Sequence, residues 1–176
     1  GGDRARTEEL VQETYLALIR HARAHPTEEF GIGWAMPGRD ALSRELERKG
    51  FTPQELLQAG LSAQREAGGL IDRFRGRVIL PIHDVAGRTV AFGGRLLADG
   101  EPKYLNSPET PLYHKSNVLY GLNRAKDEIR RAGAGIIVEG YFDLITAAQA
   151  GVRNVVATSG TALTEGHAEL MRRFAE

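Results

Sequence analysis

The sequence predicts a protein of mixed α and β structure in two parts. The first is an α+β subdomain, and the second is an α/β unit, a β-α-β arrangement with parallel strands. Three observations support this prediction. Helical spacing with glycine stops opens the chain, a hairpin pattern occupies its middle, and a strand–helix–strand pattern lies in its last third. A chain of 176 residues buries a sizeable core and holds one domain or two small ones. We place the boundary between 1–132 and 133–176.

The chain opens with a helical pattern from about Thr7 to Ala24. His25 and Pro26 predict the end of this helix, because the residue before a proline disfavours helical geometry. Residues 30–38 predict a glycine-punctuated turn or short strand, with Trp34 as a core anchor. The apolar positions of the helix are Leu10, Val11, Tyr15, Leu18 and Ile19.

Two shorter helices follow. Residues 40–49 predict a helix that stops at Gly50. Thr52 is a plausible helix cap because Glu55 follows three residues later, which is the spacing of a capping box. This second helix is predicted to end near Gly60.

The middle of the chain predicts a β-hairpin. RVILPIHD (77–84) and TVAFGGRLL (89–97) flank a turn at residues 84–87. The Gly93–Gly94 pair interrupts the returning strand, which predicts a bulge or the close approach of another backbone. PKYLNSPE (102–109) is predicted to be irregular. Three arginines alternate in RFRGR, namely Arg73, Arg75 and Arg77. They either share one face of a strand or are ordinary strand-edge charges.

The last third predicts a helix, a β-α-β unit and a final helix. A helix from Asn117 to Arg131 ends at Gly133, and strands at 136–138 and 155–157 enclose the helix between them. A last helix begins with Thr161 or Thr164 as its cap. We interpret His167, on this helix, as a surface or packing residue rather than a metal ligand.

Glu139 lies at the carboxyl end of the first of these strands. In open parallel sheets this edge carries the chemistry, and a carboxylate there suits a hard-metal site for phosphoryl transfer. Gly140 allows a close approach. Asp143 is a second ligand, a residue that orients Glu139, or a helix-start charge near the dipole. The alternative for Glu139 is a solvated or capping residue.

The charge distribution singles out the middle of the chain. The formal net charge is zero, but residues 73–126 carry nine Lys or Arg against four Asp or Glu. The first sixty residues carry eight against ten. Such clustering suits nucleic-acid binding, and a solvated face is the alternative. The sequence has no cysteine, which excludes disulfides and Cys-ligated zinc. It has no membrane-spanning run and no signal-peptide pattern, so we expect a cytoplasmic protein without a membrane partner.

Four residues of this basic stretch form a second candidate site. Arg95 can grip phosphate as a bidentate fork, and Lys103 adds a point charge. Tyr104 offers a face on which a base can stack, and Asn106 can hydrogen-bond a base edge or sugar. The alternative is an exposed loop with a packed tyrosine.

Four segments carry a resemblance to a known family, from about Phe30 to the last residue. The chain resembles the catalytic core of the bacterial replicative DNA primase. The resemblance implies that residues 1–132 are the N-terminal subdomain of that core and that residues 133–176 are the first part of a Toprim domain. The segments are DRFRGRVILPIHDVAGRTVAFGGRLL, EPKYLNSPETPLYHKSNVLYGL, VEGYFD and TSGTALTEGH.

The resemblance implies a nucleotidyltransferase, a DNA-dependent RNA polymerase that makes short RNA primers on single-stranded DNA in replication. Mg²⁺ or Mn²⁺ is the implied cofactor. The implied partners are the template, ribonucleoside triphosphates, the RNA–DNA hybrid and the replicative helicase, the last through regions that this sequence does not contain.

The resemblance also assigns residues. Glu139 matches the single glutamate of Toprim domains, a metal ligand or general acid/base, and Asp143 falls on the accompanying acidic position. Gly160 and Thr161 match the loop after the second strand. The basic groove beside the active site matches Arg95, Lys103, Tyr104 and Asn106, with Lys115 as a weaker member.

The sequence departs from the Toprim pattern in one respect. That pattern continues to a third strand ending in Asp-x-Asp, and this sequence contains no Asp-x-Asp. The family's Cys/His zinc module is absent too. We therefore expect a primase fragment that is inactive by itself and binds Mg²⁺ weakly. Two alternatives remain: a non-catalytic module that binds single-stranded DNA, and another Toprim enzyme of the topoisomerase or nuclease type.

Overall fold

The computed structural model describes residues 2–19 and 27–175 and divides the chain into two compact units. The first unit comprises Gly1–Pro81 and Thr89–Leu112. The second unit comprises Ile82–Arg88 and Tyr113–Glu176.

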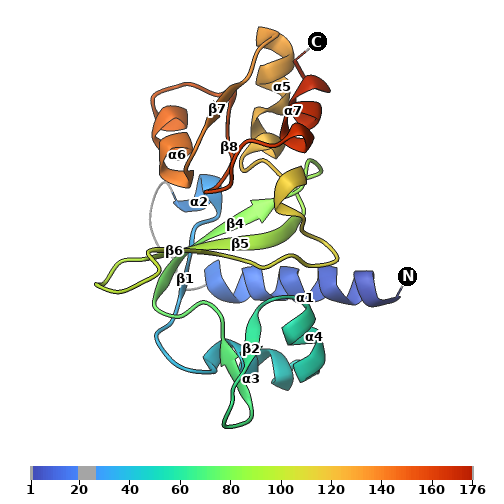
Figure 1. Ribbon diagram of the computed structural model, residues 1–176, viewed down its shortest axis with the longest axis vertical. Helices are drawn as coiled ribbons and strands as arrows, with labels where there is room; N and C mark the ends of the chain where they lie inside the picture. The colour runs from blue at the N-terminus through green and yellow to red at the C-terminus, as the bar shows by residue number, and fades with distance from the viewer. Residues whose placement is uncertain (1, 20–26, 176) are drawn as a thin grey trace. The chain divides into compact units, whose positions relative to one another are not determined.

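A four-stranded sheet forms the centre of the first unit (Figure 1). Its order is β1 (Gly33–Ala35), β4 (Arg77–His83), β5 (Thr89–Leu96) and β6 (Tyr104–Asn106). β1 pairs antiparallel with β4, and β5 pairs antiparallel with β6. The predicted strands of the central hairpin are therefore confirmed.

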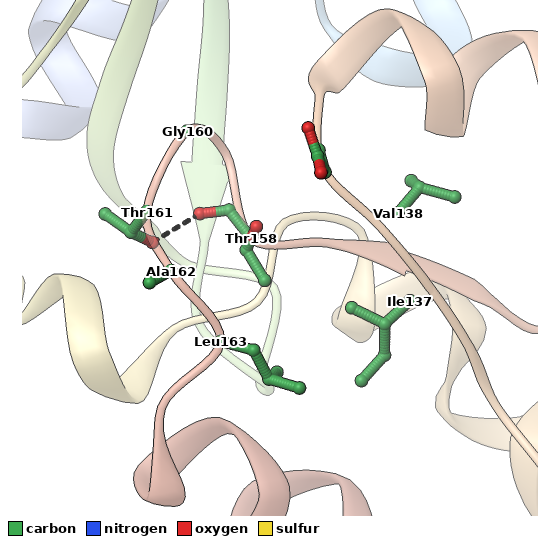
Figure 2. A pocket seen from close by; sticks show the side chains of 8 residues that line it. Ile137, Val138, Thr158, Gly160, Thr161, Ala162 and Leu163 are labelled. Atoms are coloured by element: carbon green, nitrogen blue, oxygen red, sulfur yellow. Dashed lines mark hydrogen bonds between the residues drawn. The ribbon is translucent and has the colours of Figure 1, made fainter.

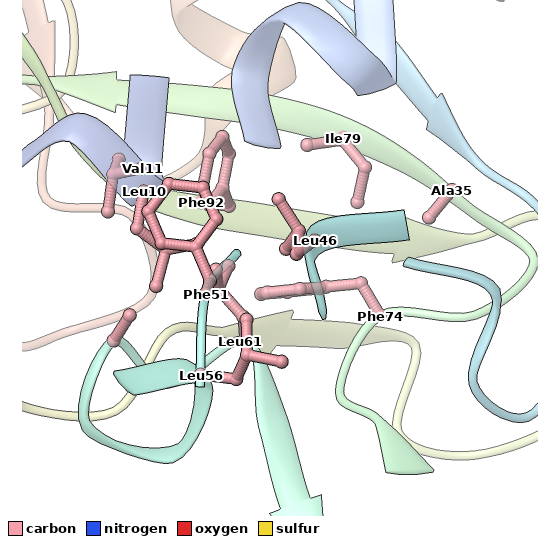
Figure 3. Close-up of a cluster of buried hydrophobic side chains, with 11 residues drawn as sticks. Leu10, Val11, Ala35, Leu46, Phe51, Leu56, Leu61, Phe74, Ile79 and Phe92 are labelled. Carbon is pink, nitrogen blue, oxygen red and sulfur yellow. The ribbon is translucent and has the colours of Figure 1, made fainter. Parts of the chain in front are cut away.

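Helices and a small hairpin complete the first unit. Helix α1 (Gly2–Ile19) packs on β1 and β5, and α2 (Thr27–Phe30) leads into β1. Beyond α1 lie α3 (Ala41–Arg48), α4 (Pro53–Gln58) and the hairpin of β2 (Ser62–Gln64) and β3 (Leu70–Asp72) (Figure 1). Figure 3 shows the core that these elements share, which includes Leu10, Val11, Leu46, Phe51, Leu56, Leu61, Phe74, Ile79 and Phe92.

Local sequence signals account for the helix boundaries in this unit. The side chain of Thr52 accepts the Glu55 N–H, and Glu55 accepts the Thr52 N–H, so the predicted capping box is confirmed. α3 ends before Gly50, which has a positive φ of 89°. The predicted end of the first helix, at His25 and Pro26, lies outside the described residues. Trp34 is only partly buried, so its interpretation as a core anchor is wrong: Gly33 and Ala35, its neighbours on β1, face inward instead.

The second unit contains the predicted β-α-β unit. β7 (Ile136–Val138) and β8 (Val155–Ala157) run parallel, joined by α6 (Tyr141–Gln149). α5 (Leu122–Ala132) and α7 (Glu165–Arg172) cover one face of the two strands, with Val156 packed among them, while α6 covers the other (Figure 1). The predicted mixed α/β fold with parallel strands at its end is thus confirmed.

Two local predictions need correction. α5 begins at Leu122 rather than Asn117, because Lys115–Asn117 form a 3₁₀ turn and Tyr120 exchanges main-chain hydrogen bonds with Ala157 of β8. The segment 102–109 is not wholly irregular, because β6 pairs with β5 in regular register. No helix among residues 2–19 and 27–175 has the length and apolarity that a membrane span requires.

Candidate functional site

The β5–β6 hairpin brings together three of the predicted nucleic-acid residues. Arg95 lies directly opposite Tyr104, and Asn106 lies two residues further along β6. Cross-strand partners and alternate residues share one face of a sheet, so these three side chains lie on the same face. The Cζ atom of Arg95 is 5.8 Å from the centre of the Tyr104 ring, which is cation–π range.

The face that these residues share reaches solvent, most of all at Tyr104, while Arg95 and Asn106 are partly buried. The Tyr104 side chain is 48% exposed, and Lys103, immediately before β6, is exposed as well. Leu105, between Tyr104 and Asn106, packs against the core of the first unit. The alternation therefore turns Tyr104 away from the core, which contradicts the alternative of a packed tyrosine.

Two arginines lie beneath the hairpin. The Arg77 guanidinium donates hydrogen bonds to the carbonyl oxygens of Pro102 (2.8 Å) and Lys103 (3.2 Å), with a longer one to Gly94 (3.5 Å). Arg73 donates twice to the carbonyl oxygen of Asn106, at 3.2 and 3.0 Å. Burial lowers the pKa of both guanidinium groups from the usual value, but arginine keeps its charge at neutral pH.

These contacts decide between the two interpretations of RFRGR. Arg73 and Arg75 lie between β3 and β4, and only Arg77 belongs to a strand. Arg75 donates to the main-chain carbonyl of Asp72. The three arginines therefore do not share one strand face, and each is directed at a main-chain carbonyl.

Gly94 explains the glycine pair on β5. A Cβ atom at Gly94 would lie 2.7 Å from Cδ1 of Phe74 and 3.1 Å from Cδ of Arg77. The close approach that the sequence predicted is thus made by side chains, while the register of Gly93 and Gly94 with β6 shows no bulge.

In the second unit, Glu139 follows the last residue of β7 and is exposed. The β7–β8 pairing continues past the strands, because the Thr158 N–H donates to the Val138 carbonyl at 3.1 Å and the Gly160 N–H to the Glu139 carbonyl at 3.2 Å. A pocket of about 420 Å³ opens beside these residues (Figure 2). Its lining consists of Ile137, Val138, Glu139, Thr158, Gly160, Thr161, Ala162 and Leu163.

The loop after β8 has an unusual backbone. Ser159 and Gly160 have positive φ values of 58° and 81°, and positive φ is uncommon for a residue other than glycine. The Thr161 hydroxyl donates to the Thr158 carbonyl at 2.6 Å (Figure 2). This turn places the main chain of the predicted Gly160–Thr161 loop against Glu139.

Asp143 serves as a helix-start residue. Its Oδ2 accepts the Gly140 N–H at 3.0 Å, in the first turn of α6. A Cβ atom on Gly140 would lie 2.9 Å from this oxygen, so glycine there leaves room for the carboxylate. The pocket is lined by Glu139 and not by Asp143.

Lys115 lies in the second unit, on a 3₁₀ turn that α7 holds. Nδ1 of His167 accepts the Thr164 N–H at 3.3 Å, and Nε2 lies 2.8 Å from the Lys115 carbonyl oxygen. This arrangement requires a proton on Nε2 and none on Nδ1. The Thr164 hydroxyl donates to the Ser116 carbonyl at 2.9 Å. His167 is fully buried, so of the two predicted roles, surface or packing residue, the structure shows packing.

The residues around Glu139 fit one position of a magnesium site. Mg²⁺ in proteins is usually bound by one or two carboxylates together with waters and substrate phosphates. Among residues 2–19 and 27–175, no group of three or more His, Cys, Asp or Glu side chains is placed to hold a metal ion. The described carboxylates thus offer one ligand at the pocket, Glu139.

Sequence reasoning missed the residues that hold these sites from within. The sequence shows Arg73 and Arg77 only as alternating charges, because their carbonyl partners lie 17 to 33 residues away. For His167, the three-residue spacing from Thr164 is that of a capping box, which predicts the start of the helix. It does not predict the hydrogen bond between His167 and the Lys115 carbonyl.

A Toprim-like family model matches residues 136–176, which form the C-terminal part of the second unit. The family model described as the DNA primase catalytic core, N-terminal domain, matches residues 4–126. The chain therefore belongs to the DNA primase family.

Individual relatives agree with this assignment. The chain is 44% identical over 165 residues to the DNA primase of Synechocystis sp. (93% of this chain, 26% of that protein). It is 49% identical over 149 residues to the DNA primase of Streptomyces coelicolor (84% of this chain, 23% of that protein). The chain thus spans about a quarter of the length of these relatives.

Solved structures share the fold over almost the whole chain. The RNA polymerase domain of Mycobacterium tuberculosis primase superposes with a TM-score of 0.92 at 35% identity, covering 100% of this chain and 63% of that chain. A DnaG primase catalytic domain bound to single-stranded DNA superposes with a TM-score of 0.84 at 34% identity, covering 98% of this chain and 61% of that chain.

Proposed function

We propose that this chain is the template-binding part and the first Toprim part of a DNA primase, a nucleotidyltransferase that lays short RNA primers on single-stranded DNA. The observation that carries the proposal is the pair formed by the half-buried Arg95 and the exposed Tyr104 on the β5–β6 hairpin, in a chain of the primase family. A cation beside an exposed aromatic ring provides both a phosphate contact and a platform for a base.

The hairpin residues have complementary roles in this proposal. Arg95 and Lys103 neutralise template phosphates, and the free face of Tyr104 stacks on a base. Asn106 hydrogen-bonds a base edge or a sugar. Lys115, on the turn that α7 holds, contributes a further phosphate contact from the second unit.

Glu139 is the catalytic carboxylate of this proposal and one ligand of Mg²⁺ or Mn²⁺. When bound, the metal neutralises charge that develops on the transferring phosphoryl group. The hydrogen bond from the Gly160 N–H fixes the main chain of Glu139. Asp143 fixes the adjacent Gly140 and so acts as a positioning residue at this site.

The wider features of a primase belong to the same proposal. Ribonucleoside triphosphates and the RNA–DNA hybrid are its substrates and products, and the replicative helicase is a partner of other regions of the protein. The protein works in the cytoplasm at the replication fork. Residues 1–132 and 133–176 are the corresponding domains.

The test is the substitution Glu139→Gln in a full-length primase that carries this core. Primer synthesis is expected to be lost, because a neutral amide neither balances the metal charge nor transfers a proton. Binding of single-stranded DNA, measured by gel shift, is expected to stay unchanged. Glu165→Gln, an exposed glutamate in the first turn of α7, is the matched control. Near-normal synthesis by the Glu139 variant would refute the assignment.

A second candidate function is a module that binds single-stranded DNA without catalysis. It is favoured by the single carboxylate at the pocket and by the absence of a three-carboxylate group among the described residues. A gel shift and a primer-synthesis assay on the same 176-residue chain separate the two functions. Another Toprim enzyme is disfavoured by the primase-specific match over residues 4–126.

A further inference from the structure

The side chain of Arg77 is almost fully buried although it carries a charge. Its exposed fraction is 6%, and its guanidinium group donates hydrogen bonds to the main-chain carbonyls of Gly94, Pro102 and Lys103. Burying a cation is costly unless it is hydrogen-bonded. The Arg77 guanidinium offsets this cost by donating to three carbonyls that belong to two segments of the chain. These hydrogen bonds can hold the two segments together.

The segments that Arg77 joins are β5 and the loop that leads into β6. The Lys103 carbonyl accepts the Leu96 N–H at 2.9 Å in addition to the bond from Arg77, so this peptide is fixed from two sides. Arg73 donates two hydrogen bonds to the carbonyl of Asn106, at the other end of β6. The two arginines therefore hold both ends of β6, a strand of only three residues.

We propose that Arg77 and Arg73 are positioning residues for nucleic-acid binding, which fix the strand that presents Lys103, Tyr104 and Asn106 without themselves contacting the ligand. The inference rests on the proposed template-binding role of the hairpin. A surface fixed before binding loses less conformational freedom on binding, so affinity rises without any new contact.

The chemistry of arginine explains its presence at both positions. The planar guanidinium has five N–H donors in a fixed fork, which lets Arg77 reach carbonyls of different residues at once. The ammonium group of lysine keeps the charge but is a compact point donor at the end of a flexible stem. Arg77→Lys therefore separates the positioning role from a purely electrostatic one.

The test measures the affinity of the chain for a fluorescent single-stranded oligonucleotide, as a double-mutant cycle. Arg77→Lys alone is expected to weaken binding about tenfold, within the range of roughly twofold to a hundredfold for directly coupled groups. In the background of Lys103→Ala plus Tyr104→Ala, the same substitution is expected to cost less than about twofold. Arg44→Lys, an exposed arginine on α3, is the matched control.

Amide hydrogen exchange provides a readout that does not depend on DNA. In the Arg77→Lys variant, residues 97–106 are expected to exchange faster, while β4 keeps its protection. Arg73→Lys is the second variant; it removes a fork from the other end of β6 and serves if Arg77→Lys does not fold.

Three results decide the question. Parent-like affinity in both lysine variants, or losses that add fully across the cycle, overturn the positioning role. Parent-like exchange at residues 97–106 also overturns it. If Lys103→Ala and Tyr104→Ala leave the affinity unchanged while exchange still accelerates, the arginines hold the hairpin but the template-binding proposal for the hairpin fails.

Discussion

Removing Tyr104 and removing Lys103 should weaken the binding of single-stranded DNA in two distinguishable ways. Tyr104 presents a 48% exposed ring beside Arg95, and Lys103 is an exposed cation at the start of β6. In the proposed function the ring stacks on a base, which is a short-range contact. The ammonium group of Lys103 is proposed to neutralise a phosphate, and such a contact releases a counterion, so its contribution depends on salt.

The expected magnitudes follow from these two contacts. For a single strand, each phosphate contact contributes about 0.7 to the slope of log K against log salt. Lys103→Ala is then expected to weaken binding about fivefold at about 0.1 M salt and hardly at all near 1 M. Tyr104→Ala is expected to cost roughly 1–3 kcal/mol, from about fivefold to about 150-fold, at every salt concentration.

Fluorescence anisotropy over a series of salt concentrations gives both quantities for each variant. Arg95→Ala is expected to lower the slope as Lys103→Ala does and also to remove the cation beside the Tyr104 ring. Arg44→Ala, whose side chain is 72% exposed on α3, is the control for the loss of one charge from the first unit. If the Tyr104, Lys103 and Arg95 variants all bind as the parent does, the hairpin is an ordinary surface and the reasoning fails.

Three further predictions concern the metal, pH and packing. The chain alone should bind Mg²⁺ only weakly, because Glu139 is the one carboxylate that lines the pocket and Mg²⁺ gives up its waters reluctantly; sub-millimolar affinity by calorimetry would contradict this. Burial and the charge of Arg124 lower the pKa of His83, so the unfolded chain binds protons more readily, and stability should fall as the pH drops below about 6.5; His83→Gln should reduce this loss in denaturant titrations. Gly94→Ala should destabilise the chain by about 1–3 kcal/mol, because its Cβ would lie 2.7 Å from Phe74; an unchanged denaturation midpoint would refute the steric argument.

The elements predicted correctly are those that local chemistry determines. The capping box of Thr52 and Glu55 is complete within four residues, and the stop at Gly133 requires only a residue that tolerates a positive φ. The β-α-β unit is similarly readable, because a short apolar run that ends at a polar residue predicts the end of a strand, although Ile136 and Ile137 of β7 are exposed. Glu139 was therefore placed at the end of β7 from sequence alone.

The elements predicted incorrectly depend on distant partners. β6 is a three-residue strand that lies between two prolines, and its main chain is held by β5, Arg73 and Arg77 rather than by its own propensity. The start of α5 is set by the pairing of Tyr120 with Ala157, thirty-seven positions along the sequence. No local pattern contains these contacts.

The same distinction applies to the candidate sites. The types of residue in PKYLN predicted a nucleic-acid surface, but only the register of β5 and β6 shows that Arg95 lies within cation–π range of Tyr104 and that Leu105 packs against the core between Tyr104 and Asn106. The sequence allows three roles for Asp143, and its hydrogen bond to Gly140 supports the helix-start role.

The two candidate sites belong to different compact units, which makes their proposed roles separable by experiment. The hairpin of the first unit carries cations and an open ring but none of the carboxylates at the pocket, so its variants should alter DNA affinity. Glu139 in the second unit is a carboxylate, which gives template phosphates no favourable contact but is the proposed metal ligand, so its loss should alter synthesis rather than affinity. A Glu139→Gln variant that loses both activities equally would show that the two units do not divide the work in this way.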